Sequence, residues 1–257
     1  MLKYAKLKER WLESERKSFK GWDFSLISSR MKEASVPWDY RESVLNYMSG
    51  ESTVMLDMGT GGGEFLLSLN PPRGRTYATE SYVPNAELCR NLLPSHGIEF
   101  RQVFGDEQLP FENDFFDLVI NRHESFCAEE VARILKPGGL FVTQQVGGAN
   151  NRELSKFVLD GGGTLTDSDF HLQRTAGQLV QAGMTIVEGK EAYPLLTFSD
   201  VEAFVYFAKV IEWEFPGFSV ETCYSRLCLL QEQIERQGCF HSVEHRFFII
   251  AQKGDLT

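Results

Sequence analysis

The stretch from Val54 to Leu69 constrains the fold more than any other part of the chain. It reads Val-Met-Leu-Asp-Met-Gly-Thr-Gly-Gly-Gly-Glu-Phe-Leu-Leu-Ser-Leu, an apolar run that ends at Asp57, then four glycines within five positions, then a second apolar run. This order predicts a strand, a tight turn and a helix. One or two glycines suffice for a plain connector, and each additional glycine costs roughly 1 kcal/mol of conformational entropy on folding. The sequence therefore favours a loop whose backbone approaches a ligand.

From residue 53 onward, strand and helix patterns alternate. Short apolar segments predict strands at residues 53–57, 76–80, 98–103, 116–121 and 140–146. Helical patterns lie between them, at residues 64–69, 84–93 and 124–135. Such βαβα alternation implies a parallel sheet with helices on both faces and right-handed crossovers.

The regions on either side of this alternation are mainly helical. Helices are predicted over residues 24–32 and 38–48, then over 154–160, 169–182, 200–213 and 220–236. Strands are predicted at 184–188, with an optional extension to 192, and at 245–251. We therefore expect one α/β domain over residues 1–257, Rossmann-like and doubly wound. Within it, residues 1–50 form a helical N-terminal cap, residues 51–192 and 240–253 form the core, and residues 193–239 form a helical insertion that covers the substrate.

The bulk composition narrows the range of partners. The formal net charge is −10 and the pI is near 5.1, which disfavours non-specific nucleic-acid binding. No apolar run approaches the ~20 residues needed to span a bilayer, and the N-terminus lacks the apolar core of a signal peptide. The cysteines number five and are scattered, as in a reduced chain. We expect a soluble, cytoplasmic protein without a membrane partner. The oligomeric state stays unknown.

Polar residues stand where the predicted strands end. They are Asp57, Glu80, Asp106 and the run Asn121-Arg122-His123. Ligands of open parallel sheets bind beyond the carboxyl ends of the strands, where the strand order reverses. One strand-end acid alone is more often a helix cap or a solvated charge. Several together predict a single crevice.

The glycine pattern distinguishes between two classes of ligand. A dinucleotide fingerprint needs a third glycine where Glu64 stands. A carboxylate at Glu80 suits two ribose hydroxyls, and Asp106 suits an exocyclic adenine amine. The loop N–H groups suit a small carboxylate, and Asp57 favours a cation. These features describe S-adenosylmethionine better than a pyrophosphate.

Five stretches in this order resemble the class I S-adenosylmethionine-dependent methyltransferases. They are residues 54–63, 78–80, 105–111, 116–123 and 134–142, the last containing Leu-Lys-Pro-Gly-Gly. The resemblance implies a seven-stranded, mostly parallel sheet with an antiparallel last strand. It also implies S-adenosyl-L-methionine as cofactor, held by Asp57, Gly59, Gly61, Gly63, Glu80, Asp106, Glu107, Leu109 and Asn121. The insertion at 193–239 lies outside the common core of the family.

The acceptor side is less constrained by the sequence. His123 is the best-placed general base, although a locally bonded edge histidine is as plausible. Tyr40, Arg122, Tyr193 and Trp213 are candidate substrate-binding residues. We expect methyl transfer by in-line displacement to a small-molecule acceptor. The alternatives are an RNA or protein methyltransferase, or a non-catalytic cofactor-binding subunit. The run 121–123 lacks the Asn-Pro-Pro-Tyr of amino-group methylators, which makes a nucleic-acid partner less favoured.

A late group of thiols and imidazoles raises the question of a metal. It comprises Cys223, Cys228, Cys239, His241 and His245. The spacing resembles that of zinc ligands only loosely, because the first two cysteines lie five apart on a predicted helix. We expect no metal.

Overall fold

A computed structural model describes residues 4–18, 24–50, 52–163 and 166–254. These residues form two compact units. The core unit comprises residues 37–146, 171–191 and 247 onward, and the second unit comprises residues up to 36, 147–170 and 192–246. Each unit is described by itself.

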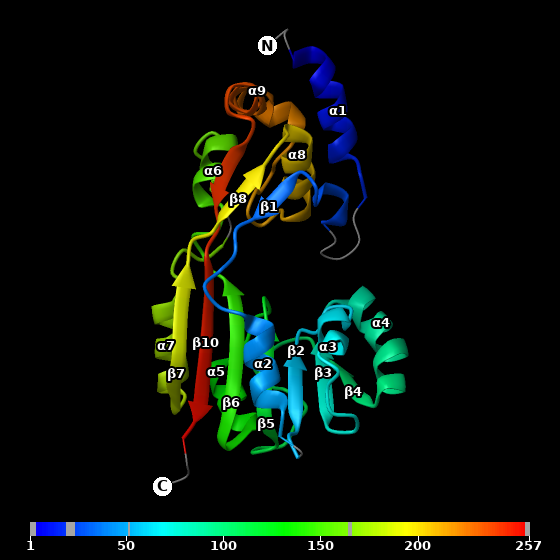
Figure 1. Ribbon diagram of the computed structural model, residues 1–257, viewed down its shortest axis with the longest axis vertical. Coiled ribbons are helices and arrows are strands. Elements are labelled where there is room, and N and C mark those ends of the chain that lie inside the picture. Colours follow the sequence, from blue (N-terminus) through cyan, green and yellow to red (C-terminus); the bar gives the residue numbers. More distant parts are fainter. Residues whose placement is uncertain (1–3, 19–23, 51, 164–165, 255–257) are drawn as a thin grey trace. The chain divides into compact units, whose positions relative to one another are not determined.

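The core unit is built on a seven-stranded sheet of order β4-β3-β2-β5-β6-β10-β7. The strands are β2 (Met55–Met58), β3 (Thr76–Glu80), β4 (Ile98–Gln102), β5 (Phe116–Arg122), β6 (Leu135–Val146), β7 (Met184–Ala192) and β10 (Arg246–Lys253). β2, β3, β4, β5 and β6 pair in parallel. The arrow of β10 in Figure 1 points against those of β6 and β7. The predicted doubly wound, mostly parallel sheet with an antiparallel last strand is therefore confirmed.

Helices accompany the strands of this unit. They are α2 (Tyr40–Met48), α3 (Glu64–Ser68), α4 (Val83–Leu92), α5 (Ala128–Ile134) and α7 (Leu172–Gln181). Every residue of β2 is buried, as expected for a central strand with both faces covered. The apolar cluster around it joins Val44 of α2, Leu66 of α3 and Phe248 of β10. Strand order reverses between β2 and β5, and the carboxyl ends of strands at such a reversal are where open parallel sheets bind their ligands.

The second unit has its own apolar core and its own sheet. Its helices are α1 (Ala5–Glu15), α6 (Arg152–Val158), α8 (Val201–Val210) and α9 (Val220–Gln237). Strands β1 (Met31–Glu33), β8 (Leu195–Phe198) and β9 (Phe240–Val243) form an antiparallel sheet of order β1-β8-β9. The aromatic residues of α8 pack in this core, with Phe204 in contact with Phe198, Phe215 and Phe240.

Two predictions for this unit were wrong. Residues 24–32 are not a helix, because a 3-10 turn (η2, Ser25–Ile27) is followed by β1. The stretch 193–239 is not wholly helical, because it contains β8. β8 pairs with β1 on one side, where Phe198 lies opposite Met31. It pairs with β9 on the other side, where Leu195 lies opposite Val243. Pairing between segments far apart in the chain decides these strands, and local periodicity does not reveal it.

Two boundaries in the core unit also differ from the prediction. Helix α5 begins at Ala128 rather than at Glu124, after a turn in which His123 has a left-handed backbone. Strand β6 begins at Leu135 rather than at Leu140, so the Lys-Pro-Gly-Gly segment lies within the strand. The register between β5 and β6 shifts between Phe116 and Leu118 to accommodate it.

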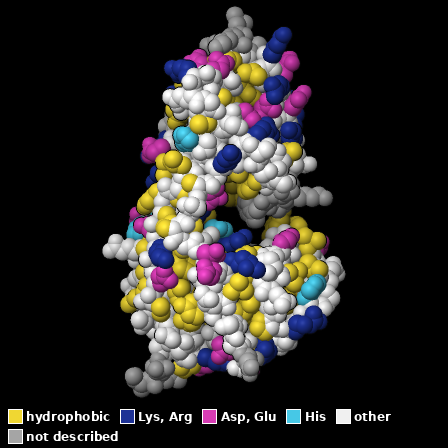
Figure 2. Space-filling view, in the orientation of Figure 1, with side chains coloured by type: hydrophobic (Ala, Val, Ile, Leu, Met, Phe, Trp, Pro, Cys, Tyr) yellow, Lys and Arg dark blue, Asp and Glu magenta, His cyan; other side chains and the backbone are white. Residues whose placement is uncertain are grey.

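Within the described residues, no helix is both long and apolar enough to cross a membrane. On the face shown in Figure 2, Lys and Arg side chains are interspersed with Asp and Glu and form no continuous basic surface.

Candidate cofactor site

The glycine loop between β2 and α3 adopts backbone angles that side chains disfavour. Gly59 has φ +69° and Gly61 has φ +63°, both in the left-handed region. A Cβ at Gly59 would collide with the side chain of Glu124, whereas a Cβ at Gly61 would meet open space. The loop therefore uses glycine for conformation at both positions, and the Gly61 backbone is open to approach.

Glu80, at the end of β3, turns its carboxylate back onto this loop. Its Oε2 accepts from the N–H of Gly61 at 2.8 Å, and its Oε1 accepts from the N–H groups of Ser81 and Tyr82 at 2.9 and 2.8 Å. The residue is 4% exposed. Three N–H donors compensate its burial and leave acceptor capacity, because a carboxylate offers about four lone pairs. Its assignment to a ribose stays a prediction.

Asp57 is the penultimate residue of β2, directly before the glycine loop. It is buried, and burial raises the pKa of its carboxyl to about 7, with Glu80 adding to the rise while Thr60 and Arg122 oppose it. Asp57 is therefore about half protonated at neutral pH. A positive charge placed beside it would favour the ionised form.

The segment after β4 carries the residues that are predicted to flank the adenine. Asp106 and Glu107 line an open hollow that extends along the chain from Gln102 to Pro110. Phe104 belongs to the same hollow and is 84% exposed. Leu109 is buried, and its N–H donates to Glu130 of α5 at 2.5 Å, which fixes the base of the segment.

Asn121, near the end of β5, is fully buried in a polar group that includes two side chains of β6. Its Oδ1 accepts from Thr143 Oγ1 at 2.9 Å and from Gln145 Nε2 at 2.5 Å. Its Nδ2 has no partner in the described structure. A buried amide donor of this kind costs free energy until an acceptor reaches it.

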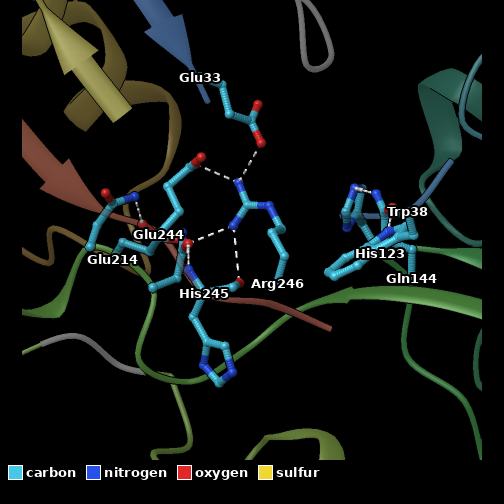
Figure 3. A network of polar contacts seen from close by, with 10 residues as sticks. Glu33, Trp38, His123, Gln144, Glu214, Glu244, His245 and Arg246 are labelled. Atoms are coloured by element: carbon cyan, nitrogen blue, oxygen red, sulfur yellow. Dashed lines mark hydrogen bonds and ion pairs between the residues drawn. The ribbon is translucent and has the colours of Figure 1, made fainter. Parts of the chain in front are cut away.

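His123 lies beyond β5 with a φ of +64°, an uncommon angle for a residue with a side chain. Its N–H donates to the carbonyl of Gln144 at 2.9 Å, and its Nε2 lies 3.3 Å from Gln144 Nε2. Trp38 Nε1 donates to the Oε1 of the same glutamine at 2.7 Å. Figure 3 shows Trp38, Gln144 and His123 grouped in this way. The residue His123 is exposed to solvent.

Glu124 belongs to this site, and the sequence analysis did not single it out. Its side chain lies against Gly59. Burial raises the pKa of Glu124, and the carboxylates of Glu80 and Asp106 raise it further. Its place directly after a run of strand-end polar residues was the only signal in the sequence.

The four candidate substrate-binding residues divide between the units. In the core unit, Tyr40 is buried and its hydroxyl donates to the Asn121 carbonyl at 3.1 Å, while Arg122 lies over the ring of Phe65 at 4.4 Å. In the second unit, Tyr193 is 55% exposed and Trp213 is 37% exposed. Their assignment to a substrate stays a prediction.

A buried polar network in the second unit includes one member of the late imidazole group. His245 is buried, and its ring stacks on that of Tyr193 with 4.7 Å between the ring centroids. The backbone N–H of His245 donates to Asn150 Oδ1 at 2.8 Å. The guanidinium of Arg246 reaches the same oxygen at 2.5 Å and also contacts Glu244 and Glu33, as Figure 3 shows for the two glutamates.

The network includes an unusual carboxyl group. Glu244 is buried, and burial raises its pKa to about 8 against the opposing effect of Arg246. Of the other late residues, Cys239 and His241 contact each other, with 3.6 Å between Sγ and Nε2. Cys223 and Cys228 are buried on α9, and His241 Nδ1 lies 2.9 Å from Thr197 Oγ1. Among the described residues, no three Cys, His, Asp or Glu side chains gather as metal ligands would.

Comparison with known proteins bears on the stretch from β2 to β6. The family described as "Methyltransferase domain" matches residues 56–143. This stretch of the chain is similar to methyltransferase domains. The match spans the glycine loop, Glu80, Asp106 and the turn that carries His123 and Glu124.

One relative and two solved structures extend the comparison. A probable phthiotriol/phenolphthiotriol dimycocerosates methyltransferase 2 from Mycobacterium ulcerans is 33% identical over 102 residues, which are 37% of this chain and 39% of that protein. A putative methyltransferase from Bacillus halodurans C-125 has a TM-score of 0.58 at 17% identity and covers 83% of this chain and 98% of its own. A functionally unknown protein from Deinococcus radiodurans R1 has a TM-score of 0.59 at 14% identity and covers 98% of this chain and 100% of its own.

These similarities cover different shares of the chain. The chain matches well under half the length of the curated relative. The likeness to the Deinococcus radiodurans protein extends over nearly the whole chain, at an identity that shows the fold alone.

Proposed function

We propose that this protein transfers the methyl group of S-adenosyl-L-methionine to a small-molecule acceptor. The observation that carries the proposal is the set of groups at the carboxyl ends of β2, β3 and β5. A glycine loop with an open backbone, a carboxylate bound to that loop and a buried amide donor without a partner stand together there.

The residues fit this cofactor chemically. The glycine-loop backbone and the buried donor Asn121 Nδ2 suit the carboxylate of its amino-acid part. Glu80 suits the ribose hydroxyls, and Asp106 and Glu107 suit the adenine side. Asp57 and Glu124 supply negative charge for its positive groups. When bound, the cofactor supplies a methyl group already activated by the adjacent sulfonium.

The residues of this chain then hold the cofactor, align the acceptor with its methyl group and shield both from water. In-line displacement needs the acceptor atom close to the methyl carbon and on the side opposite the sulfur. A general base is needed only for an acceptor that loses a proton, and His123 is an exposed residue at the strand end for that role.

Two observations favour a small acceptor. The formal charge of −10, and the mixed charge on the face seen in Figure 2, give a phosphate backbone little to bind. The related mycobacterial protein is named for phthiotriol and phenolphthiotriol dimycocerosates, an acceptor named as a chemical compound rather than as a protein or nucleic acid.

Calorimetry tests the cofactor. S-adenosylmethionine and S-adenosylhomocysteine are expected to bind, and NADH is not. Binding of NADH alone would overturn the proposal. A methyl-transfer screen with labelled cofactor against metabolite and RNA pools then tests the acceptor class. Label that enters RNA and no metabolite would replace the small acceptor with a nucleic acid.

A further inference from the structure

The turn after β5 has a strained conformation that β6 holds in place. His123 takes a φ of +64°, which costs a residue with a Cβ about 1 kcal/mol. Two consecutive glutamines of β6 restrain the turn. The carbonyl of Gln144 accepts from the His123 N–H at 2.9 Å, and Gln145 Nε2 donates to the Glu124 carbonyl at 3.0 Å. Strain that neighbouring contacts maintain in this way is common at functional sites.

The restrained turn places the Glu124 side chain against the cofactor loop. A Cβ at Gly59 would overlap the Cβ and Cγ of Glu124, so only glycine allows this approach. The carboxylate of Glu124 interacts with those of Glu80 and Asp106, and both raise its pKa. Within the described part of the chain, Glu124 forms no ion pair. Negative charges that meet at one place without a cation are unfavourable until a cation binds.

Asn121 gives an independent indication of a ligand at the carboxyl end of β5. Gln145 Nε2 donates to the Glu124 carbonyl, so it must also act as a donor toward Asn121 Oδ1. This fixes the orientation of the Asn121 amide and leaves Nδ2 as a fully buried donor without a partner. Gln145 thus holds both the unsatisfied amide of Asn121 and the backbone carbonyl of Glu124.

We propose that the Glu124 carboxylate binds a positively charged group of the methyl donor and that Gln145 positions it for this role. The inference rests on the proposed function. The donor carries two positive groups, the sulfonium and the α-ammonium. The demethylated product keeps the ammonium and loses the sulfonium charge, so the two ligands distinguish which group Glu124 meets.

Calorimetric titration of three proteins tests the role of Glu124. They are the unchanged protein, Glu124→Gln, and Glu129→Gln, whose exposed carboxylate lies five residues further along. We expect Glu124→Gln to weaken binding of S-adenosylmethionine about tenfold. A loss confined to S-adenosylmethionine places Glu124 at the sulfonium, and an equal loss for S-adenosylhomocysteine places it at the ammonium. Glu129→Gln should bind both ligands as the unchanged protein does.

The outcomes separate this inference from the proposed function. If the unchanged protein binds neither ligand, the proposed function fails. If it binds both and Glu124→Gln binds them equally well, the function stands and the role of Glu124 is overturned.

A double-mutant cycle tests the role of Gln145. Gln145→Met keeps the length of the side chain and removes the donor. We expect it to weaken donor binding severalfold in the unchanged background and to have little further effect beside Glu124→Gln. Additive losses would show that Gln145 does not act through Glu124. If Gln145→Met does not fold, Gln145→Glu, which also removes the donor, takes its place in the same cycle.

Discussion

The carboxylate of Glu80 accepts a hydrogen bond from the backbone N–H of Gly61, with 2.8 Å between Oε2 and N. This contact joins the end of β3 to the centre of the glycine loop after β2. Cys89 of α4 holds the next peptide group of the same glycine, because its Sγ donates to the Gly61 carbonyl at 3.1 Å. A cofactor that approaches Gly61 therefore meets a loop already held in shape.

We expect Glu80→Ala to lower the affinity for S-adenosylmethionine by about tenfold, since it removes a charge-assisted acceptor and loosens the loop. Calorimetry measures the change. Glu87→Ala, on the exposed face of α4, is the matched control and should not alter binding. An affinity unchanged by Glu80→Ala would remove Glu80 from the site.

The raised pKa of Asp57, about 7, predicts that donor binding depends on pH. A positive ligand favours the ionised carboxylate, so affinity should rise severalfold between pH 6 and pH 8. In the free protein the sign is opposite. The acid is protonated more readily when folded, so its contribution to stability is present at low pH and is lost as pH rises through about 7.

Titration of Asp57→Asn over the same pH range checks this assignment. The variant should bind more weakly at pH 8 and lose most of the pH dependence. A pH dependence that persists unchanged in the variant would assign the effect to another group.

His123→Ala should lower the turnover number more than it weakens cofactor binding if the ring accepts a proton from the acceptor molecule. The comparison uses turnover with the acceptor found by the screen and cofactor affinity from calorimetry. His96→Ala, an exposed histidine of the 3-10 turn Leu93–His96, is the control. Equal losses in both quantities would make His123 structural.

The raised pKa of Glu244 predicts that the stability of the second unit depends on pH. Its pKa is raised to about 8, so its favourable contribution is complete below about pH 4.5 and is lost as pH rises through 8. The charged groups that face it are Arg246, which opposes the rise, and Glu33, which adds to it. We expect the free energy of unfolding of the unchanged protein to fall by about 4 kcal/mol more than that of Glu244→Gln between pH 5 and pH 9.

Urea denaturation at the two pH values measures this difference. Glu232→Gln, exposed on α9, controls for the loss of a charge. Parallel pH profiles for the unchanged protein and Glu244→Gln would show that Glu244 does not titrate in this range.

The sequence by itself determined the core fold and the donor side of the candidate site. Strand, glycine turn and helix follow one another within residues 54–69, and local patterns specify such a unit. Parallel strands all end at one edge of a sheet, so Asp57, Glu80 and Asn121 could be predicted to stand near each other from chain order alone.

Only the tertiary structure decided the rest. Strand β1 exists because Met31 to Glu33 pair with Phe198 to Leu196, across more than 160 residues of chain. The place of Glu124 against Gly59 likewise depends on a left-handed turn at His123 and on a glutamine from the neighbouring strand. Local periodicity carries no information about such contacts, because their energies come from groups that are distant in sequence and adjacent only after folding.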